Sequence, residues 1–297
     1  MSTSTETIPA TWTVLGLLKW TTGYFDRKGV EGARASAELL LAKCLQLNRL
    51  DLYLRYDQPL SVDELARFKG LIQRRVQGEP VAYITGERAF WTLDLAVTPD
   101  VLIPRPETER LVEIALDALQ SMQSARPRIL DLGTGSGAIV LALAAGHPEG
   151  YFVALDRSIG ALRIARENQR RNGIGAEIDY LAADWCAPLN PDAKPFDLIV
   201  TNPPYIAAAE IAGLQAEIRH FEPRAALDGG ADGLDCLRLI LTEAADRLAS
   251  GGHLVVEMGA DQAESVTALA STVSAYRKVE IHKDYAGLDR IAHLSRN

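Results

Sequence analysis

The sequence predicts an α/β protein in which a mostly parallel sheet of about seven strands follows a small all-helical region. Three patterns support this fold class. From residue 109 onward, short apolar runs alternate with segments whose apolar residues recur at helical spacing. Before residue 79 only the helical spacing occurs, and short aromatic runs then flank Gly86, as they do in a β-hairpin.

These changes of pattern divide the chain into four parts. Residues 1–9 are polar and rich in Ser and Thr, so we expect a disordered tail. A Gly-Glu-Pro sequence ends the helical pattern and sets the next boundary. We therefore expect a helical domain over 10–78, a β-hairpin linker over 79–101 and an α/β domain over 102–297.

The helical region contains four segments that predict helices. Apolar residues share one face over about 12–25 and again over about 31–45. Asp51 is expected to cap a short third helix through its side-chain oxygen. Ser61 and Glu64 have the spacing of a capping box, in which each side chain accepts from the other's backbone N–H, so they predict the start of the fourth helix.

The linker predicts two strands, over 81–84 and 90–95, with Gly86 in the turn between them. An extended segment with two prolines follows, because proline lacks the N–H that regular ladders need. Glu107 or Thr108 is expected to begin the next helix.

The α/β region alternates strands with helices, which favours a parallel sheet covered on both faces. Strands are expected at 128–132, 151–155, 177–181, 196–201, 253–257, 277–283 and 289–294. Helices are expected at 109–122, 137–146, 158–171, 234–249 and 261–274.

Composition narrows the function classes. Net charge is −8, but the first 90 residues carry 12 Lys and Arg against 10 Asp and Glu, whereas the rest carry 19 against 29. An acidic body is a poor surface for nucleic acid, so DNA is not an expected partner. Three scattered cysteines favour a reduced, cytoplasmic protein, and the five histidines show no metal-ligand spacing. No signal sequence, membrane span or metal site is expected.

A glycine-rich turn follows the first predicted parallel strand. Glycines let a backbone turn tightly and approach a ligand closely. Asp156 ends the next strand, where a carboxylate accepts hydrogen bonds from both hydroxyls of a ribose. The candidate residues of the turn are Gly133, Thr134, Gly135, Ser136 and Gly137.

The turn and the acidic residue also satisfy the G-x-G-x-x-A pattern of dinucleotide-binding proteins. Two features point away from that reading. The three glycines are closely spaced behind Asp131, and Asp184 and Trp185 follow the third strand. There a carboxylate can accept from an adenine amino group while the indole contacts the ring; the structural alternatives are a turn cap and core packing.

The residues Asn202, Pro203, Pro204 and Tyr205 directly follow an apolar strand. Two prolines end the strand and stiffen the turn, at the sheet edge where ligands bind in open α/β folds. The Asn202 side-chain oxygen and the Pro203 carbonyl can accept the two hydrogens of a planar NH2 group, and Tyr205 can pack against it.

The glycine turn with Asp156 resembles the S-adenosylmethionine site of Rossmann-like methyltransferases, and Asn202–Tyr205 resembles the N-P-P-Y signature of enzymes that methylate adenine or glutamine amides. A wider set of segments is similar to the HemK-type release-factor glutamine methyltransferases, and the resemblance covers nearly the whole chain. These segments are 80–86, 102–109, 222–227 and 286–290, together with Phe90 and Trp91.

The resemblance implies methyl transfer from S-adenosylmethionine to the side-chain amide nitrogen of the glutamine in the Gly-Gly-Gln loop of class I peptide chain release factors. It implies that the helical domain helps to hold the release factor, and we expect a monomer. The cofactor residues are then 133–137, Asp156, Asp184, Trp185 and Asn202, and the catalytic or substrate residues are Asn202, Pro203, Pro204 and Tyr205.

Three alternatives remain at this point. An adenine-N6 methyltransferase acting on DNA or RNA shares both motifs but is expected to carry a basic recognition region. An NAD-dependent oxidoreductase leaves Asn202–Tyr205 unexplained, and a non-catalytic binding module leaves both motifs unexplained. Five charged residues have open roles. Lining the substrate entrance or bracing the first helix of the α/β domain are the alternatives for Arg105, Glu107 and Glu109, and bracing the Asn202–Tyr205 loop or forming a structural ion pair are those for Glu222 and Arg224.

Overall fold

The computed structural model describes residues 11–122, 124–186, 189–190 and 193–297. The predicted tail, 1–9, lies outside the described residues. Two compact units are present, Met1–Gly86 and Glu87–Asn297, and each is described by itself. Within the described residues no helix is long and apolar enough to cross a membrane.

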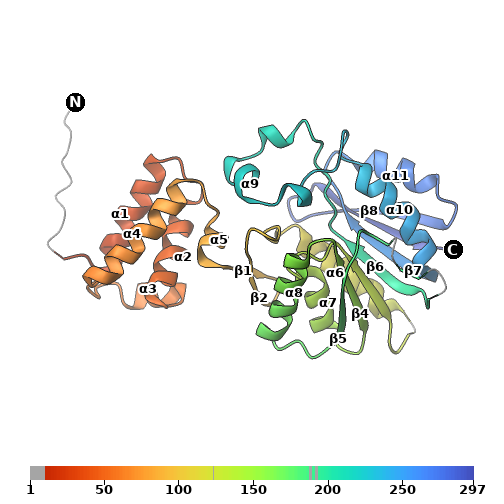
Figure 1. The fold of residues 1–297 in the computed structure, drawn as a ribbon, viewed down its shortest axis with the longest axis horizontal. Helices are drawn as coiled ribbons and strands as arrows, with labels where there is room; N and C mark the ends of the chain where they lie inside the picture. Colours follow the sequence, from red (N-terminus) through yellow and green to blue (C-terminus); the bar gives the residue numbers. More distant parts are fainter. Residues whose placement is uncertain (1–10, 123, 187–188, 191–192) are drawn as a thin grey trace. The chain divides into compact units, whose positions relative to one another are not determined.

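The first unit is a helical bundle around one apolar core (Figure 1). Most residues on the predicted helix faces are buried there, including Leu18, Phe25, Leu40 and Phe68. A Ser61 capping box begins the fourth helix as predicted. The helices are α1 (Val14–Arg27), α2 (Ala33–Leu45), α3 (Arg49–Leu54), α4 (Val62–Val76) and α5 (Val81–Thr85).

The cap of α3 differs from the prediction. Asn48, not Asp51, is the N-cap, and its Oδ1 accepts from the Asp51 N–H at 3.2 Å. Asp51 lies at the third helical position and accepts from the Asn48 N–H in return. Both residue types suit a cap, so the sequence places the cap three residues too late because Asp51 fills the other half of the box.

The predicted strand over 81–84 is wrong, because this segment forms the short helix α5. Pro80 precedes the helix with φ −55°, and Gly86 ends it in the left-handed region with φ 76°. A glycine in the left-handed conformation is common at helix C-caps as well as in turns, so Gly86 does not distinguish a helix end from a hairpin turn. Ile84 is buried in the core of the helical unit, so packing favours the helix.

A β-hairpin is present, but further along the chain than predicted. Its strands are β1 (Glu87–Phe90) and β2 (Leu93–Ala96), paired antiparallel. The run 90–95, predicted as one strand, therefore contains the turn. Trp91 takes a positive φ of 56° there, which non-glycine residues rarely adopt.

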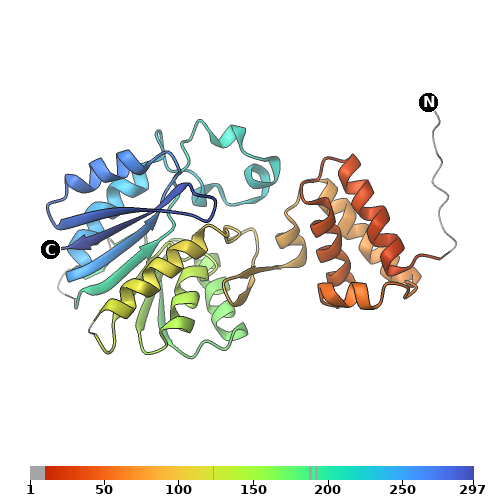
Figure 2. The same cartoon turned by 180° about the vertical axis from the view of Figure 1, so that it is seen from behind.

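The second unit is a seven-stranded sheet with helices on both faces (Figures 1 and 2). Its strand order is β5-β4-β3-β6-β7-β9-β8, with parallel pairing as far as β7 and antiparallel pairing after it. The strands are β3 (Arg128–Leu132), β4 (Tyr151–Asp156), β5 (Glu177–Ala182), β6 (Phe196–Thr201), β7 (Leu248–Glu257), β8 (Tyr276–Lys283) and β9 (Asp289–Arg296). The longer helices are α6 (Thr108–Ser121), α7 (Ala138–Gly146), α8 (Ile159–Arg171), α10 (Asp235–Arg247) and α11 (Ala263–Ser271).

This architecture confirms the predicted fold class. Every predicted strand of the α/β region is present, although β7 begins five residues earlier than expected, at Leu248. Helix α6 begins at Thr108 after Glu107, as predicted, and α11 is shorter than expected at both ends. A short helix, α9 (Ala216–Phe221), and two 3-10 turns lie in the long connection between β6 and α10.

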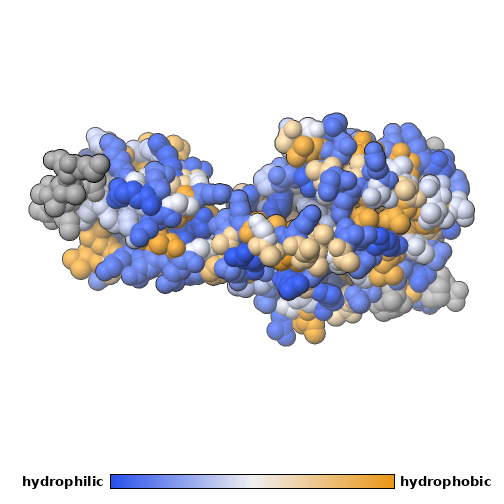
Figure 3. All heavy atoms as spheres, turned by 90° about the horizontal axis from the view of Figure 1, so that it is seen from above, coloured by the Kyte–Doolittle hydropathy of each residue, from blue (hydrophilic) through white to orange (hydrophobic). Residues whose placement is uncertain are grey.

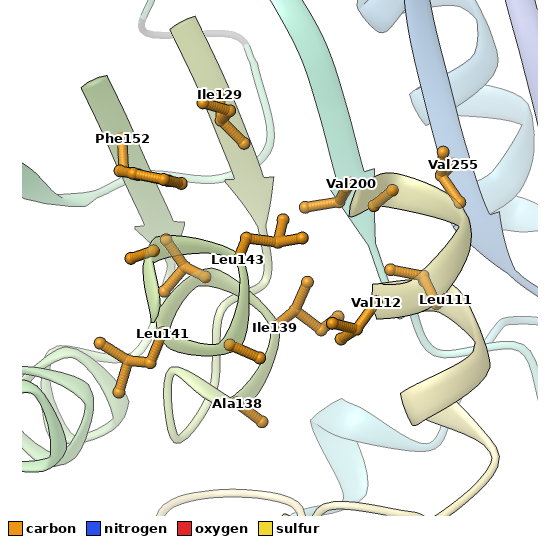
Figure 4. Packing of buried hydrophobic residues seen from close by; sticks show 14 of the residues in the cluster. Leu111, Val112, Ile129, Ala138, Ile139, Leu141, Leu143, Phe152, Val200 and Val255 are labelled. Carbon is orange, nitrogen blue, oxygen red and sulfur yellow. The ribbon is translucent and has the colours of Figure 1, made fainter. Parts of the chain in front are cut away.

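The central strands of the sheet are buried on both faces, as is typical of a parallel sheet covered by helices. Successive residues of β3 show this: Ile129 belongs to one apolar cluster and Leu130 to the other. Figure 4 shows the first cluster, where Ile129 and Phe152 of the sheet lie over Leu143 of α7, and Val200 lies on the side of α6. The rigid, buried strands fix the positions of the loops at their carboxyl ends.

The surface is mixed. On the face shown in Figure 3 hydrophilic residues predominate, with hydrophobic residues among them in small groups. Exposed large apolar side chains of the helical unit include Leu50, Leu54 and Val62. Scattered residues of this kind are normal on soluble domains and need no special explanation.

Candidate active site

A cavity of about 370 Å³ lies at the carboxyl ends of the parallel strands. In open α/β sheets this edge is the usual ligand site, because the loops after adjacent strands converge there. Candidate residues that follow four different strands line this cavity. Those in its lining are Gly133, Thr134, Gly135, Ser136, Asp156, Asp184, Trp185, Asn202 and Pro204. Gly137, Pro203 and Tyr205 are not in the lining.

The glycine turn between β3 and α7 needs its glycines for different reasons. Gly133, Gly135 and Gly137 have φ values of 71°, 55° and 83°, which side chains disfavour. A Cβ on Gly133 or Gly135 would meet nothing closer than 3.8 Å, so these residues leave the cavity open. A Cβ on Gly137 would lie 3.1 Å from Ala165 and Leu141, so that glycine allows α7 and α8 to pack closely.

Thr134 anchors the turn to the sheet. Its N–H donates to the Leu155 carbonyl at 2.8 Å, and its hydroxyl donates to Asp131 Oδ2 at 2.6 Å. Asp131 is fully buried at the end of β3, and burial raises the pKa of its carboxyl to about 7, although the Thr134 hydrogen bond opposes this. The pair fixes the turn from below the cavity.

Asp156 ends β4 and borders the cavity. Its Oδ2 accepts from the Gly135 N–H at 2.9 Å, and its Oδ1 accepts from the Ser158 N–H at 2.8 Å. Each carboxylate oxygen has two lone pairs, so both retain acceptor capacity towards the cavity. The two backbone bonds orient the carboxylate and tie the β4 end to the glycine turn.

Asp184 and Trp185 follow β5 and line the same cavity. Trp185 has a positive φ of 50°, an uncommon conformation for a bulky residue. A Cβ on Gly133 would lie 3.8 Å from the Trp185 ring, so the indole lies over the glycine turn. It is half-buried and packs against the core beside α10. The conformation aims a flat apolar wall at the cavity.

Asn202 begins a chain of side-chain hydrogen bonds at the end of β6. Its Nδ2 donates to Thr108 Oγ1 at 3.1 Å. The Thr108 hydroxyl donates to Glu257 Oε2 at 2.7 Å, and the Tyr205 hydroxyl donates to Glu257 Oε1 at 3.3 Å. Glu257 is 1% exposed, and burial raises its pKa to about 7.

Tyr205 is placed differently from the sequence expectation. Burial and the neighbouring Glu257 raise the pKa of its phenol, so it remains neutral. Its ring packs on the core of the sheet, and its carbonyl accepts from Gln262 Nε2 at 3.0 Å. Pro203 is buried beside it. Both residues therefore hold the turn that presents Asn202 and Pro204 to the cavity.

The loop after Tyr205 is locked against the turn by glycines. The Ile206 carbonyl accepts from the Gly229 N–H at 2.9 Å. A Cβ on Gly229 would lie 2.9 Å from the Pro204 carbonyl oxygen and from Tyr205 Cα. A Cβ on Gly233 would lie 2.4 Å from the Tyr205 carbonyl oxygen. Only glycine permits this approach, which fixes the backbone of the turn.

The five charged residues with open roles fall into four arrangements. Glu222 is buried and accepts from Arg105 Nη2 at 2.6 Å and from the Ile103 N–H at 3.1 Å. It braces the segment before α6, while Arg105 also lines the cavity. Arg224 pairs with Asp228 at 3.1 Å. Glu109 accepts from the Trp91 N–H at 2.9 Å, and Glu107 is the N-cap position of α6.

Sequence reasoning missed several residues of the site. Thr108 was considered only as a helix start and Glu257 not at all, although a glutamate ending an apolar strand is a usable signal. The lining also includes Pro99, Val101 and Cys236, whose types carry no signal for binding. Among the described residues, no three Cys, His, Asp or Glu side chains group as metal ligands.

The comparisons with known proteins agree with this geometry. Residues 16–86 match the PrmC N-terminal domain, and residues 112–220 match the methyltransferase small domain. The chain is 44% identical to the release factor glutamine methyltransferase of Geobacter sulfurreducens, over 95% of this chain and 96% of that protein. It is 45% identical to the one of Moorella thermoacetica, over 88% and 91% of the two chains.

One solved structure is similar to this protein in its fold alone. The hMettl16 catalytic domain, in complex with a 3′UTR hairpin, is 17% identical with a TM-score of 0.55, over 70% of this chain and 76% of that chain. The sheet, the glycine turn and the matched domain define a Rossmann-like methyltransferase. At more than 40% identity over almost its whole length, the chain belongs to the release factor glutamine methyltransferase family.

Proposed function

We propose that this protein transfers a methyl group from S-adenosylmethionine to the side-chain amide nitrogen (N5) of the glutamine in the Gly-Gly-Gln loop of class I release factors. The observation that carries the proposal is one cavity bordered on one side by the glycine turn and Asp156, and on the other by Asn202. A methyl donor and an amide acceptor need such an arrangement, because reacting groups must be held together in line.

The residues present fit the methyl donor. The turn at Gly133 and Gly135 leaves space at the cavity, Asp156 keeps acceptor capacity for ribose hydroxyls, and Trp185 offers a flat apolar surface for a purine. Asp184 lines the same cavity and is proposed to accept from an adenine amino group. When bound, S-adenosylmethionine supplies an electrophilic methyl group. Thr134, Ser136 and Gly137 complete the turn.

The acceptor side is built from polar groups held in place before the substrate arrives. Asn202 Nδ2 is occupied by Thr108, so its Oδ1 is the atom left to accept an N–H of the substrate amide. The Pro203 carbonyl is proposed as the second acceptor, and Pro204 as a wall. Such acceptors favour positive charge developing on the attacking nitrogen. Tyr205 supports the turn.

Glutamine is favoured over adenine as the target. Relatives named for glutamine methylation of release factors span this chain almost completely, including its helical unit. The body beyond residue 90 carries ten more acidic than basic residues, a poor match for nucleic acid. The adenine-N6 alternative is therefore not favoured.

The partner and the setting follow from this proposal. The helical domain is proposed to contact the release factor, and the domain that follows the β1–β2 hairpin is proposed to catalyse methyl transfer. The protein is proposed to act in the cytoplasm, because its substrate takes part in translation. It is also proposed to be a monomer.

The test offers both substrates together. Purified protein is incubated with S-adenosylmethionine, a class I release factor and DNA, and the products are mapped by peptide and nucleoside mass spectrometry. The expected result is one methyl group on the Gly-Gly-Gln glutamine and unmodified DNA. An unmodified glutamine beside methylated adenine would overturn the proposal.

A further inference from the structure

The acceptor amide of Asn202 has an orientation that depends on buried residues from two distant elements. An asparagine amide can turn over and exchange its oxygen and nitrogen, since the two ends have nearly the same shape. Only one orientation leaves Oδ1 towards a substrate N–H. The residues that decide between the two orientations therefore decide whether the site accepts an amide.

The hydrogen bonds fix this choice. The single hydroxyl proton of Thr108 is donated in a hydrogen bond to Glu257 Oε2 at 2.7 Å, because a carboxylate can only accept. The Thr108 oxygen is then left as an acceptor and takes an Nδ2 proton of Asn202 at 3.1 Å. In the reversed orientation two oxygens would face each other with no proton between them, in a buried place where that costs most.

We propose that Thr108 and Glu257 are positioning residues that hold the Asn202 side-chain oxygen towards the substrate amide. This inference rests on the proposed function and adds the source of its geometry. Thr108 borders the cavity and Glu257 lies behind it, and both are proposed to act through Asn202. Tyr205 steadies the far end, donating to Glu257 Oε1 at 3.3 Å.

This hydrogen-bond relay, from Asn202 through Thr108 to Glu257, works only when Glu257 is a carboxylate. Protonated, it has a hydroxyl of its own, so Thr108 no longer has to donate to it and the Asn202 orientation loses its support. Burial raises the Glu257 pKa to about 7; Arg290 of β9 favours the charged form and Glu107 opposes it. Turnover is therefore expected to fall as pH falls through about 7.

Stability changes with pH in the opposite direction. The folded pKa of Glu257 exceeds its ordinary value of 4.5. Its contribution to stability is therefore fully present below that value and is lost as pH rises through about 7. A merely structural role predicts loss of activity on the alkaline side, whereas the positioning role predicts loss on the acidic side. The pH profile separates the two.

The experiment compares matched variants in the full-length protein. Thr108→Val removes the hydroxyl at nearly constant volume, and Thr108→Ser keeps it. We expect Thr108→Val to lower kcat roughly 10- to 100-fold with little change in KM or in S-adenosylmethionine affinity, and Thr108→Ser to stay within about threefold. Thr267→Val, on an exposed turn of α11, is the control for the substitution itself.

Glu257→Gln tests the second residue, since its side-chain oxygen still accepts from Thr108 but does not titrate. It is expected to keep most of the plateau rate and to lose the acidic limb of the kcat–pH profile. Wild-type turnover by Thr108→Val, equal losses in Thr108→Val and Thr108→Ser, or an unchanged acidic limb in Glu257→Gln would each overturn the proposal.

A readout without substrate separates this proposal from the function. In ¹⁵N NMR spectra of the protein alone, one Asn202 Nδ2 proton should be protected from exchange in wild type and Thr108→Ser, but not in Thr108→Val. If wild type modifies no release factor yet shows this protection, the function fails and the relay stands. If the release factor is modified and the protection is absent, the relay fails alone.

Discussion

The two sides of the cavity are built by different means. On the cofactor side, the Asp156 carboxylate accepts from a backbone N–H of the glycine turn, and the two lie at the ends of adjacent strands. On the acceptor side, Asn202 bonds to Thr108 of α6, which is 94 residues away in the sequence. Thr108 in turn bonds to Glu257 of β7, which is 149 residues away. The first side is a local motif and the second a tertiary construction, so substitutions on the two sides should have separable effects.

The largest effect on the cofactor side is expected at Asp156. Asp156→Ala removes the proposed ribose acceptor and the bond to the Gly135 N–H. Hydrogen bonds to charged groups are worth more than neutral ones, so affinity for S-adenosylmethionine should fall roughly 10- to 100-fold. Isothermal titration calorimetry measures this, and kcat at saturating cofactor should change little.

The control for this substitution is Asp117→Ala, an exposed position on α6 away from the cavity. If the two alanine variants bound the cofactor equally well, Asp156 would have no role in binding. If Asp156→Ala lost turnover at saturating cofactor without losing affinity, the two sides of the cavity would not be separable.

A smaller effect is expected at Gly137, which serves packing on the cofactor side. Gly137→Ala and Gly251→Ala both force a side chain into the left-handed region, with φ 83° and 75°. Only at Gly137 does the new Cβ meet neighbours, 3.1 Å away, whereas nothing lies within 4 Å at Gly251. Overpacking should cost Gly137→Ala about 1–3 kcal/mol more free energy of unfolding, as measured by urea denaturation. Equal losses would mean that the packing of α7 on α8 tolerates the methyl group.

This comparison also explains how far the sequence could be read. Hydrophobic alternation and periodicity predicted the sheet because a buried parallel sheet selects residues strand by strand. The glycine turn, Asp156 and Asn202 were found because each directly follows a strand, which places it at the sheet edge. These are short-range signals.

What the sequence did not yield depends on contacts between distant segments. Thr108 and Glu257 each look like an ordinary residue at an element boundary, and only the fold joins them to Asn202. The bond from the Tyr205 hydroxyl to Glu257 is another such long-range contact, which the expectation that Tyr205 packs against a flat amide does not include. The segment 81–84 was misread because left-handed Gly86 serves helix ends and turns alike.

The central claim is that Asn202 serves the acceptor more than the cofactor, whose binding depends mainly on the glycine turn and Asp156. Its most direct test is Asn202→Ala, with S-adenosylmethionine affinity measured by calorimetry and release-factor methylation measured in a single turnover on the same preparation. We predict affinity within about threefold of wild type and a methyl-transfer rate lower by roughly 100- to 1,000-fold, the usual cost of removing one preorganised polar group. A rate near that of wild type, or a loss explained entirely by weaker cofactor binding, would contradict the account.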